Sequence, residues 1–105
     1  MRIVPVALAL AGLVAAGPVL ADAGEDLLKK SGCMQCHALD KKIVGPAYVE
    51  VAAKYKDDPA AAAKLAAKVK NGGAGVWGPV LMPPNPSVSD ADIKTMVAYI
   101  LALKK

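Results

Sequence analysis

The sequence predicts an all-α domain of four short helices, and three observations favour this class. Apolar residues recur at helical spacing in the second half of the chain. Acidic residues, serine or proline stand where helices would begin, and glycines stand where two of them would end. No stretch shows the strict alternation of a half-buried strand. The 105 residues are enough for one small domain.

Residues 1–21 have the organisation of a secretory signal peptide. Arg2 provides a short basic start, residues 3–20 are almost entirely apolar, and small residues stand at the positions that a signal peptidase reads. We expect cleavage after Ala21, with Ala23 as a second candidate site. The leader therefore predicts export from the cytoplasm.

The alternative for this leader is a retained membrane anchor. Its apolar stretch could barely span a bilayer. Pro5 and the Gly17-Pro18 pair interrupt it near both ends. We therefore expect no stable membrane insertion and a single mature domain at residues 22–105.

The first two helices of the mature domain are expected at residues 22–30 and 47–55. In the first, Asp22 can cap the N-terminus, and two lysines in the last turn complement the helix dipole. The second begins after Gly45-Pro46, a pair that punctuates the chain strongly.

The third helix is expected at residues 60–70, with Asp58 as N-cap and Pro59 at the first helical position. The sequence Asn71-Gly72-Gly73 ends it. Its apolar stripe comprises Ala62, Leu65, Ala66 and Val69.

The fourth helix is expected to run from Ser89, its N-cap, to about Leu103, with Asp92 completing a capping-box-like start. Residues 74–88 before it form a glycine- and proline-rich loop that contains Trp77, and we expect this loop to be ordered and functional. The apolar face of the fourth helix comprises Ile93, Met96, Val97, Ile100 and Leu101.

The most informative stretch is Cys33-Met34-Gln35-Cys36-His37, which has the C-x-x-C-H spacing of c-type haem attachment. Two thiols three residues apart lie on one side of a tight turn, so each can form a thioether with one haem vinyl group. The next residue, His37, is then held below the iron as the proximal ligand. The sequence therefore predicts one covalently bound haem c around which the helices wrap.

Two other readings use the same cysteines. A structural disulfide or a thioredoxin-like C-x-x-C does not require His37, and the βαβ pattern of thioredoxins is absent around the motif. A tetrahedral zinc site normally takes four Cys or His ligands, whereas the chain has two cysteines and one histidine. A covalent haem would also stabilise a domain whose own core is marginal.

A haem iron held by His37 needs a sixth ligand, and the candidates are methionines and lysines. Met34 lies within the attachment turn on the proximal side, and Met96 belongs to the apolar face of the last helix. Met82 lies in the long loop next to two prolines that stiffen its backbone. Elimination and context therefore favour Met82 as the second axial ligand.

Histidine and methionine ligation would occupy both axial positions, which favours electron transfer over catalysis. The thioether favours Fe(II) and raises the potential. The alternative is a haem enzyme or gas sensor, such as a small peroxidase, which needs an open sixth position and a polar distal group. The chain offers no second histidine, and its only arginine is Arg2 in the leader.

The formal net charge of +4 falls by one when the leader is removed. This charge is too small and too scattered for nucleic acid binding. Lysine pairs at residues 29–30 and 41–42 lie near the haem motif. They either provide ordinary solubility or form a basic rim that guides docking onto acidic redox partners. We expect a monomer that binds those partners transiently at the haem edge.

Three segments together resemble the small bacterial class I cytochromes c of the cytochrome c-551 type. They are the haem motif at residues 32–37, Val44-Gly45-Pro46-Ala47-Tyr48, and Gly75-Val76-Trp77-Gly78-Pro79-Val80-Leu81-Met82-Pro83-Pro84-Asn85. The resemblance covers the whole mature chain. It implies a small class I cytochrome c fold and a periplasmic electron carrier between respiratory donors and a terminal reductase or oxidase.

The resemblance also implies roles for individual residues. It implies thioethers at Cys33 and Cys36 and axial ligands His37 and Met82. The residues that it places around the haem are Pro46, whose carbonyl would orient the imidazole, Trp77, which would donate to a propionate, and Asn85, which would support the methionine side.

Two positions depart from the family pattern. Lys68 stands where many members have a propionate-binding arginine, and it offers a weaker contact than a guanidinium fork. Leu28 replaces an aromatic residue often found in the first helix. Without the resemblance, Trp77 could equally be a core residue whose indole N–H needs a partner.

Overall fold

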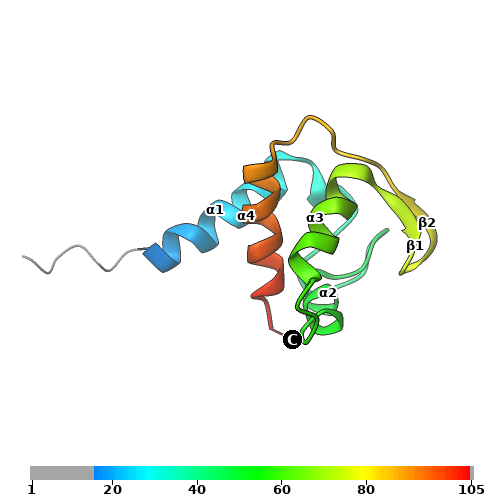
Figure 1. Ribbon diagram of the computed structural model, residues 1–105, viewed down its shortest axis with the longest axis horizontal. Coiled ribbons are helices and arrows are strands. Elements are labelled where there is room, and N and C mark those ends of the chain that lie inside the picture. The colour runs from blue at the N-terminus through cyan, green and yellow to red at the C-terminus, as the bar shows by residue number, and fades with distance from the viewer. Residues whose placement is uncertain (1–15, 105) are drawn as a thin grey trace, which may run out of the picture.

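The computed structural model describes residues 16–104, in which four α-helices pack together and a small two-stranded hairpin lies at one edge of the domain (Figure 1). The predicted all-α architecture with four short helices is confirmed, with the hairpin as an addition. The elements in chain order are α1 (Ala16–Lys30), the 3-10 turn η2 (Cys33–Gln35), α2 (Tyr48–Lys54), α3 (Ala61–Asn71), β1 (Gly73–Gly75), β2 (Gly78–Met82) and α4 (Asp90–Leu101).

Helix α1 begins at Ala16, earlier than the expected start at Asp22, so it continues through the proposed cleavage site at Ala21. Residues 1–15 of the expected signal peptide lie outside the described residues. The cleavage therefore remains a prediction.

The hairpin corrects the expectation of a loop without strands. Strands β1 and β2 pair antiparallel, with Gly73 opposite Met82 and Gly75 opposite Gly78. These three glycines have φ values of 128°, 115° and 106°, which other residues rarely adopt. Because glycine and proline are depleted in strands, a glycine-rich hairpin carries no strand signal in the sequence.

Two helix starts test the predicted caps. Ser89 caps α4 as expected, because its hydroxyl accepts a hydrogen bond from the Asp92 N–H at 3.1 Å. The N-cap of α3 is Ala60 rather than Asp58. Asp58 instead accepts from the Ala60 N–H at 2.8 Å and from Lys64 Nζ at 2.7 Å, so it binds the turn that precedes the helix.

Helix α4 is the centre of the core, and α1, α2 and α3 all pack against it. Four of the five residues predicted for its apolar face are buried, and Met96 is only 1% exposed. On α3 the stripe is shifted, because Ala61 is buried and Ala62 is exposed. Residues of the core cluster are Leu28, Tyr48, Val51, Ile93, Met96, Val97 and Ile100.

The crossing of α1 and α4 depends on one glycine. A Cβ on Gly24 would clash with the Cβ of Tyr99, so the absent side chain lets the two helices approach closely. The other end of α1 leads through Gly32, with φ of 81°, into the cysteine turn. The packing of α1 on α4 therefore also sets where the haem motif lies.

Candidate haem site

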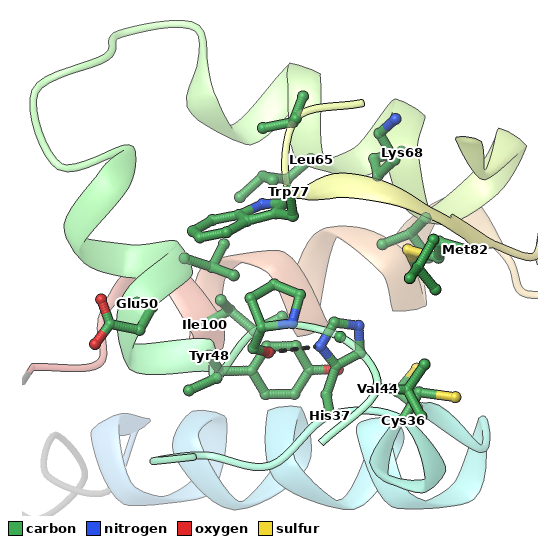
Figure 2. A pocket seen from close by; sticks show the side chains of 18 of the residues that line it. Cys36, His37, Val44, Tyr48, Glu50, Leu65, Lys68, Trp77, Met82 and Ile100 are labelled. Atoms are coloured by element: carbon green, nitrogen blue, oxygen red, sulfur yellow. Dashed lines mark hydrogen bonds between the residues drawn. The ribbon is translucent and has the colours of Figure 1, made fainter. Parts of the chain in front are cut away.

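A cavity of about 470 Å³ opens between the cysteine motif and the hairpin. Its size falls within the roughly 300–1,000 Å³ of ligand and cofactor pockets. We call residues 33–48 the proximal wall and residues 68–85 the distal wall. Figure 2 shows the two walls, with His37 and Cys36 on one side and Met82, Trp77 and Lys68 on the other.

Hydrogen bonds to the backbone carbonyl of Cys33 shape the cysteine turn. It accepts from the N–H of Cys36 at 3.2 Å and from the N–H of His37 at 3.1 Å. Both cysteines are free, partly exposed and part of the cavity wall. Burial raises the pKa of the Cys33 thiol, whereas redox-active C-x-x-C cysteines have lowered pKa values.

The imidazole of His37 is held in a defined orientation. Its Nδ1 lies 2.8 Å from the backbone oxygen of Pro46 (Figure 2). Because a carbonyl only accepts, Nδ1 carries the proton and Nε2 keeps its lone pair. His37 lines the cavity, so the ring can offer Nε2 to a metal there.

Two further residues confine this ring, and sequence patterns do not predict either contact. The ring of Tyr48 stacks on the imidazole, with centroids 4.7 Å apart and planes inclined by 18°. A Cβ on Gly45 would lie 2.5 Å from His37 Cε1, so only glycine leaves room for the imidazole. Burial raises the pKa of the Tyr48 hydroxyl, which therefore stays protonated.

Met82 reaches the cavity from the end of β2. Its backbone pairs with Gly73, and a Cβ on Gly72 would clash with the Met82 carbonyl oxygen and the Pro84 nitrogen. The other candidate methionines are placed differently. Met96 touches the cavity from the buried core, and Met34 packs beside the core without lining the cavity.

Of the remaining predicted site residues, three line the cavity and one stabilises the segment that follows Met82. Pro46, Lys68 and Trp77 line the cavity, and Trp77 is 44% exposed. The ammonium of Lys54 lies 5.8 Å from the centroid of the Trp77 ring. Asn85 does not line the cavity; its side chain donates to the Val69 carbonyl at 3.1 Å, which holds the segment after Met82 against α3.

The lining of the cavity suits a large, flat, apolar group with a charged edge. Several large apolar side chains in the wall are about half exposed, and lysines lie at its margin. A planar macrocycle would cover the apolar side chains, and propionates would lie near the lysines. The exposed apolar lining residues are Val44, Val76, Trp77, Val80 and Leu81, and the marginal lysines are Lys41, Lys42 and Lys68.

In residues 16–104, protein side chains alone form no candidate metal site. Within that range, no group of three or more His, Cys, Asp or Glu side chains could hold a metal ion. A haem iron differs, because the porphyrin supplies four ligands and the protein needs to supply only the axial ones.

Comparison with known proteins supports the haem site. The family model of cytochrome c matches residues 21–104. Cytochrome c-552 from Nitrosomonas europaea is 51% identical over 96 residues, which are 91% of each chain. Cytochrome c-551 from Pseudomonas aeruginosa is 48% identical over 101 residues, covering 91% of this chain and 96% of the relative.

Solved structures confirm the predicted small class I cytochrome c fold. The crystal structure of wild-type Nitrosomonas europaea cytochrome c552 matches with a TM-score of 0.74 and 52% identity, over 76% of this chain and 99% of that one. The class 1 cytochrome MtoD from Sideroxydans lithotrophicus matches with a TM-score of 0.66 and 33% identity, over 77% and 92% of the two chains.

The chain belongs to the cytochrome c family. Within that family, its relatives are small class I cytochromes of the c-551 type. Membership implies a covalently bound haem c and places the protein among electron carriers, as the sequence predicted. No helix in residues 16–104 has the length and apolar character to cross a membrane.

Proposed function

We propose that the protein is a periplasmic single-electron carrier with haem c attached through Cys33 and Cys36 and ligated by His37 and Met82. One observation carries this proposal. The imidazole, with Nδ1 bonded to Pro46, lines the same cavity as the Met82 side chain, which comes from the other wall. The haem supplies an iron that changes by one electron.

The residues of the chain then have distinct tasks. The Pro46 carbonyl holds the proton on Nδ1, so Nε2 remains the ligating atom and the imidazole becomes more basic. Tyr48 and Gly45 restrict rotation of the ring. Because these contacts do not depend on the oxidation state, little rearrangement would accompany electron transfer.

The distal wall would influence the reduction potential of the iron and exclude water from it. The Met82 thioether favours the reduced iron and raises the potential. Lys68 and Trp77, both in the cavity wall, would hold the propionates. Asn85 would keep the Met82 segment in place through its bond to Val69. With both axial positions occupied by the protein, substrates and gases would have no coordination site, so we propose no enzymatic activity.

Docking would occur where the haem edge meets solvent. Lys41 and Lys42 are exposed at the cavity margin and would form part of a basic rim for acidic redox partners. We propose a monomer that docks through a small, transient interface. Delivery to the periplasm would rest on cleavage of residues 1–21 after Ala21.

Near-infrared spectroscopy of the ferric holoprotein tests the ligand assignment. We expect a weak thioether-to-iron band that Met82→Leu abolishes while the covalent haem is retained. Met96→Leu is the matched control, because it makes the same change in the buried core and conserves volume. Retention of the band in Met82→Leu would contradict the assignment.

A further inference from the structure

The segment between Met82 and α4, residues 83–89, has few internal hydrogen bonds to stabilise its conformation. Three of its residues are proline and lack an N–H, so few hydrogen bonds can form within the segment. Within the segment, the Val88 N–H donates to the Asn85 carbonyl at 3.3 Å, and the Asn85 side chain donates to the Pro83 carbonyl at a long 3.4 Å. The position of Met82 therefore depends on bonds to a neighbouring element.

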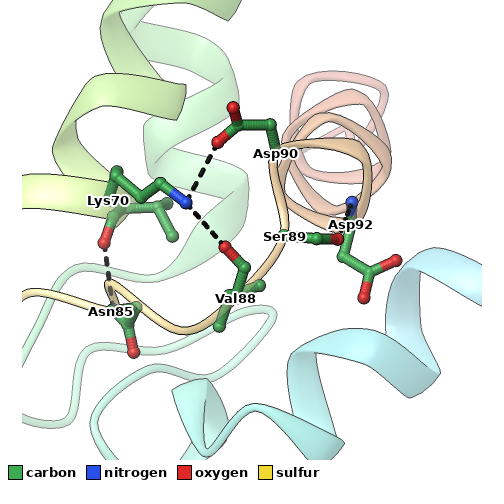
Figure 3. Close-up of polar contacts among 7 residues, drawn as sticks. Lys70, Asn85, Val88, Ser89, Asp90 and Asp92 are labelled. Carbon is green, nitrogen blue, oxygen red and sulfur yellow. Dashed lines mark hydrogen bonds and ion pairs between the residues drawn. The ribbon is translucent and has the colours of Figure 1, made fainter.

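That neighbour is the last turn of α3, which binds the segment at two points (Figure 3). At the first point, the Asn85 N–H donates to the carbonyls of Val69 and Lys70 at 3.1 and 3.2 Å. At the second point, Lys70 Nζ donates to the Val88 carbonyl at 2.8 Å. Lys70 thus takes part in both attachments, through its backbone oxygen and its ammonium.

The two contacts of the ammonium differ in strength. Lys70 Nζ also lies 3.0 Å from Asp90 Oδ1, but the Asp90 side chain is 92% exposed, so water and salt screen this ion pair. The side chain of Lys70 is only 33% exposed, and its bond to the Val88 carbonyl is partly buried. A charge-assisted bond in such a place contributes more than an exposed ion pair.

We propose that Lys70 is a positioning residue for Met82, which it secures through the Val88 carbonyl rather than through Asp90. By fixing the far end of the proline-rich segment, the lysine limits excursions of the thioether away from the cavity. This inference rests on the proposed axial role of Met82. Lys70 itself does not line the cavity and so acts without touching the haem.

The test compares ferric holoproteins carrying Lys70→Met, Lys70→Arg, Asp90→Asn and Lys64→Met. Lys64→Met is the matched control, because it makes the same change on the same helix and removes the bond to Asp58 instead. The readouts are the near-infrared thioether band and the helical circular dichroism, both followed through a guanidinium titration.

We expect Lys70→Met to raise the equilibrium constant for loss of the band about tenfold, ahead of helix unfolding. Lys70→Arg should restore most of the difference, and Asp90→Asn and Lys64→Met should stay within about twofold of the wild type. Equal displacement of the band and of helix unfolding in Lys70→Met would overturn the proposal, and so would an Asp90→Asn effect as large as that of Lys70→Met.

Amide exchange provides a readout that does not depend on the iron. In Lys70→Met, the Asn85 and Val88 amides should exchange about tenfold faster, and the Ala60 amide at the other end of α3 should not change. Unchanged exchange at Asn85 and Val88 would overturn the proposal. Absence of the thioether band from the wild type would instead refute Met82 ligation, so the two failures are distinguishable.

If a Lys70 variant fails to mature, the proposal can still be tested on the wild-type protein. Partial acetylation of its lysines, followed by separation of molecules that have lost the thioether band, should enrich acetyl-Lys70 in that fraction and leave acetyl-Lys64 evenly distributed. An even distribution of acetyl-Lys70 would overturn the proposal.

Discussion

The two walls of the haem cavity are built by different means. On the proximal wall, the cysteine turn and His37 are held by contacts within a short stretch of chain, and the bond from His37 to Pro46 spans nine residues. On the distal wall, Met82 is held by contacts between distant segments. The bonds from Asn85 to Val69 and from Lys70 to Val88 span 16 and 18 residues.

This difference predicts unequal stability. Local contacts on the proximal wall would be reinforced by two covalent thioethers, whereas the distal wall depends on the docking of a proline-rich segment onto α3. Segments held by few, partly exposed hydrogen bonds open at lower free energy than the core. The methionine side should therefore release the iron first when the protein is destabilised.

The largest effect is expected from Gly45→Val on the proximal wall. Even one carbon at this position would lie 2.5 Å from His37 Cε1 and 2.9 Å from Nδ1, so the imidazole would be displaced from its site. We expect little or no mature holoprotein, measured by haem staining of a denaturing gel. Ile43→Ala changes a nearby exposed residue that does not line the cavity and should mature normally. Normal yield and spectrum from Gly45→Val would show that the ring is not confined as described.

A smaller effect is expected from Gly72→Ala on the distal wall. Gly72 has φ of 72° and ψ of −163°, a conformation almost restricted to glycine, and a Cβ there would clash with the backbone at Met82. The cost should be about 1–3 kcal/mol. The thioether band should therefore be lost at a lower denaturant concentration than in the wild type, while haem attachment remains complete. Loss of attachment instead would mean that the two walls are not independent.

The smallest effect is expected from Asp58→Asn, which lies away from both walls. The Lys64 ammonium, together with the Ala60 N–H, lowers the pKa of this carboxyl. A lowered pKa in the folded state stabilises the protein above the ordinary carboxyl pKa, and this contribution is lost as pH falls through the folded value. The variant should melt at a slightly lower temperature at neutral pH, and the difference should vanish as pH falls through the folded pKa of Asp58. A pH-independent difference in melting temperature would contradict this.

The proximal wall could be predicted from sequence because its chemistry is local. The spacing of Cys33, Cys36 and His37 itself indicates the turn and predicts the proximal ligand. The contacts of Gly45 and Tyr48 with the imidazole were not predictable, because a glycine before proline indicates only a turn and a helical tyrosine indicates only a core position. Both contacts arise from the conformation of the loop that joins His37 to Gly45 and Tyr48.

The distal wall was predicted only in outline. Elimination and context indicate Met82, but nothing in the sequence predicts its strand, because β1 and β2 pair largely through glycines, which have low strand propensity. Lys70 looks like an ordinary surface lysine in the sequence. Its role emerges only when a segment 18 residues away packs against it.

Carbon monoxide binding to the reduced wild-type holoprotein tests the central claim most directly, namely that residues on both walls close the haem axially. If His37 and Met82 both ligate the iron, the visible spectrum at neutral pH should not change when carbon monoxide is added. Prompt conversion to a carbon monoxide adduct would contradict the account, because it would require an open coordination site on the distal side.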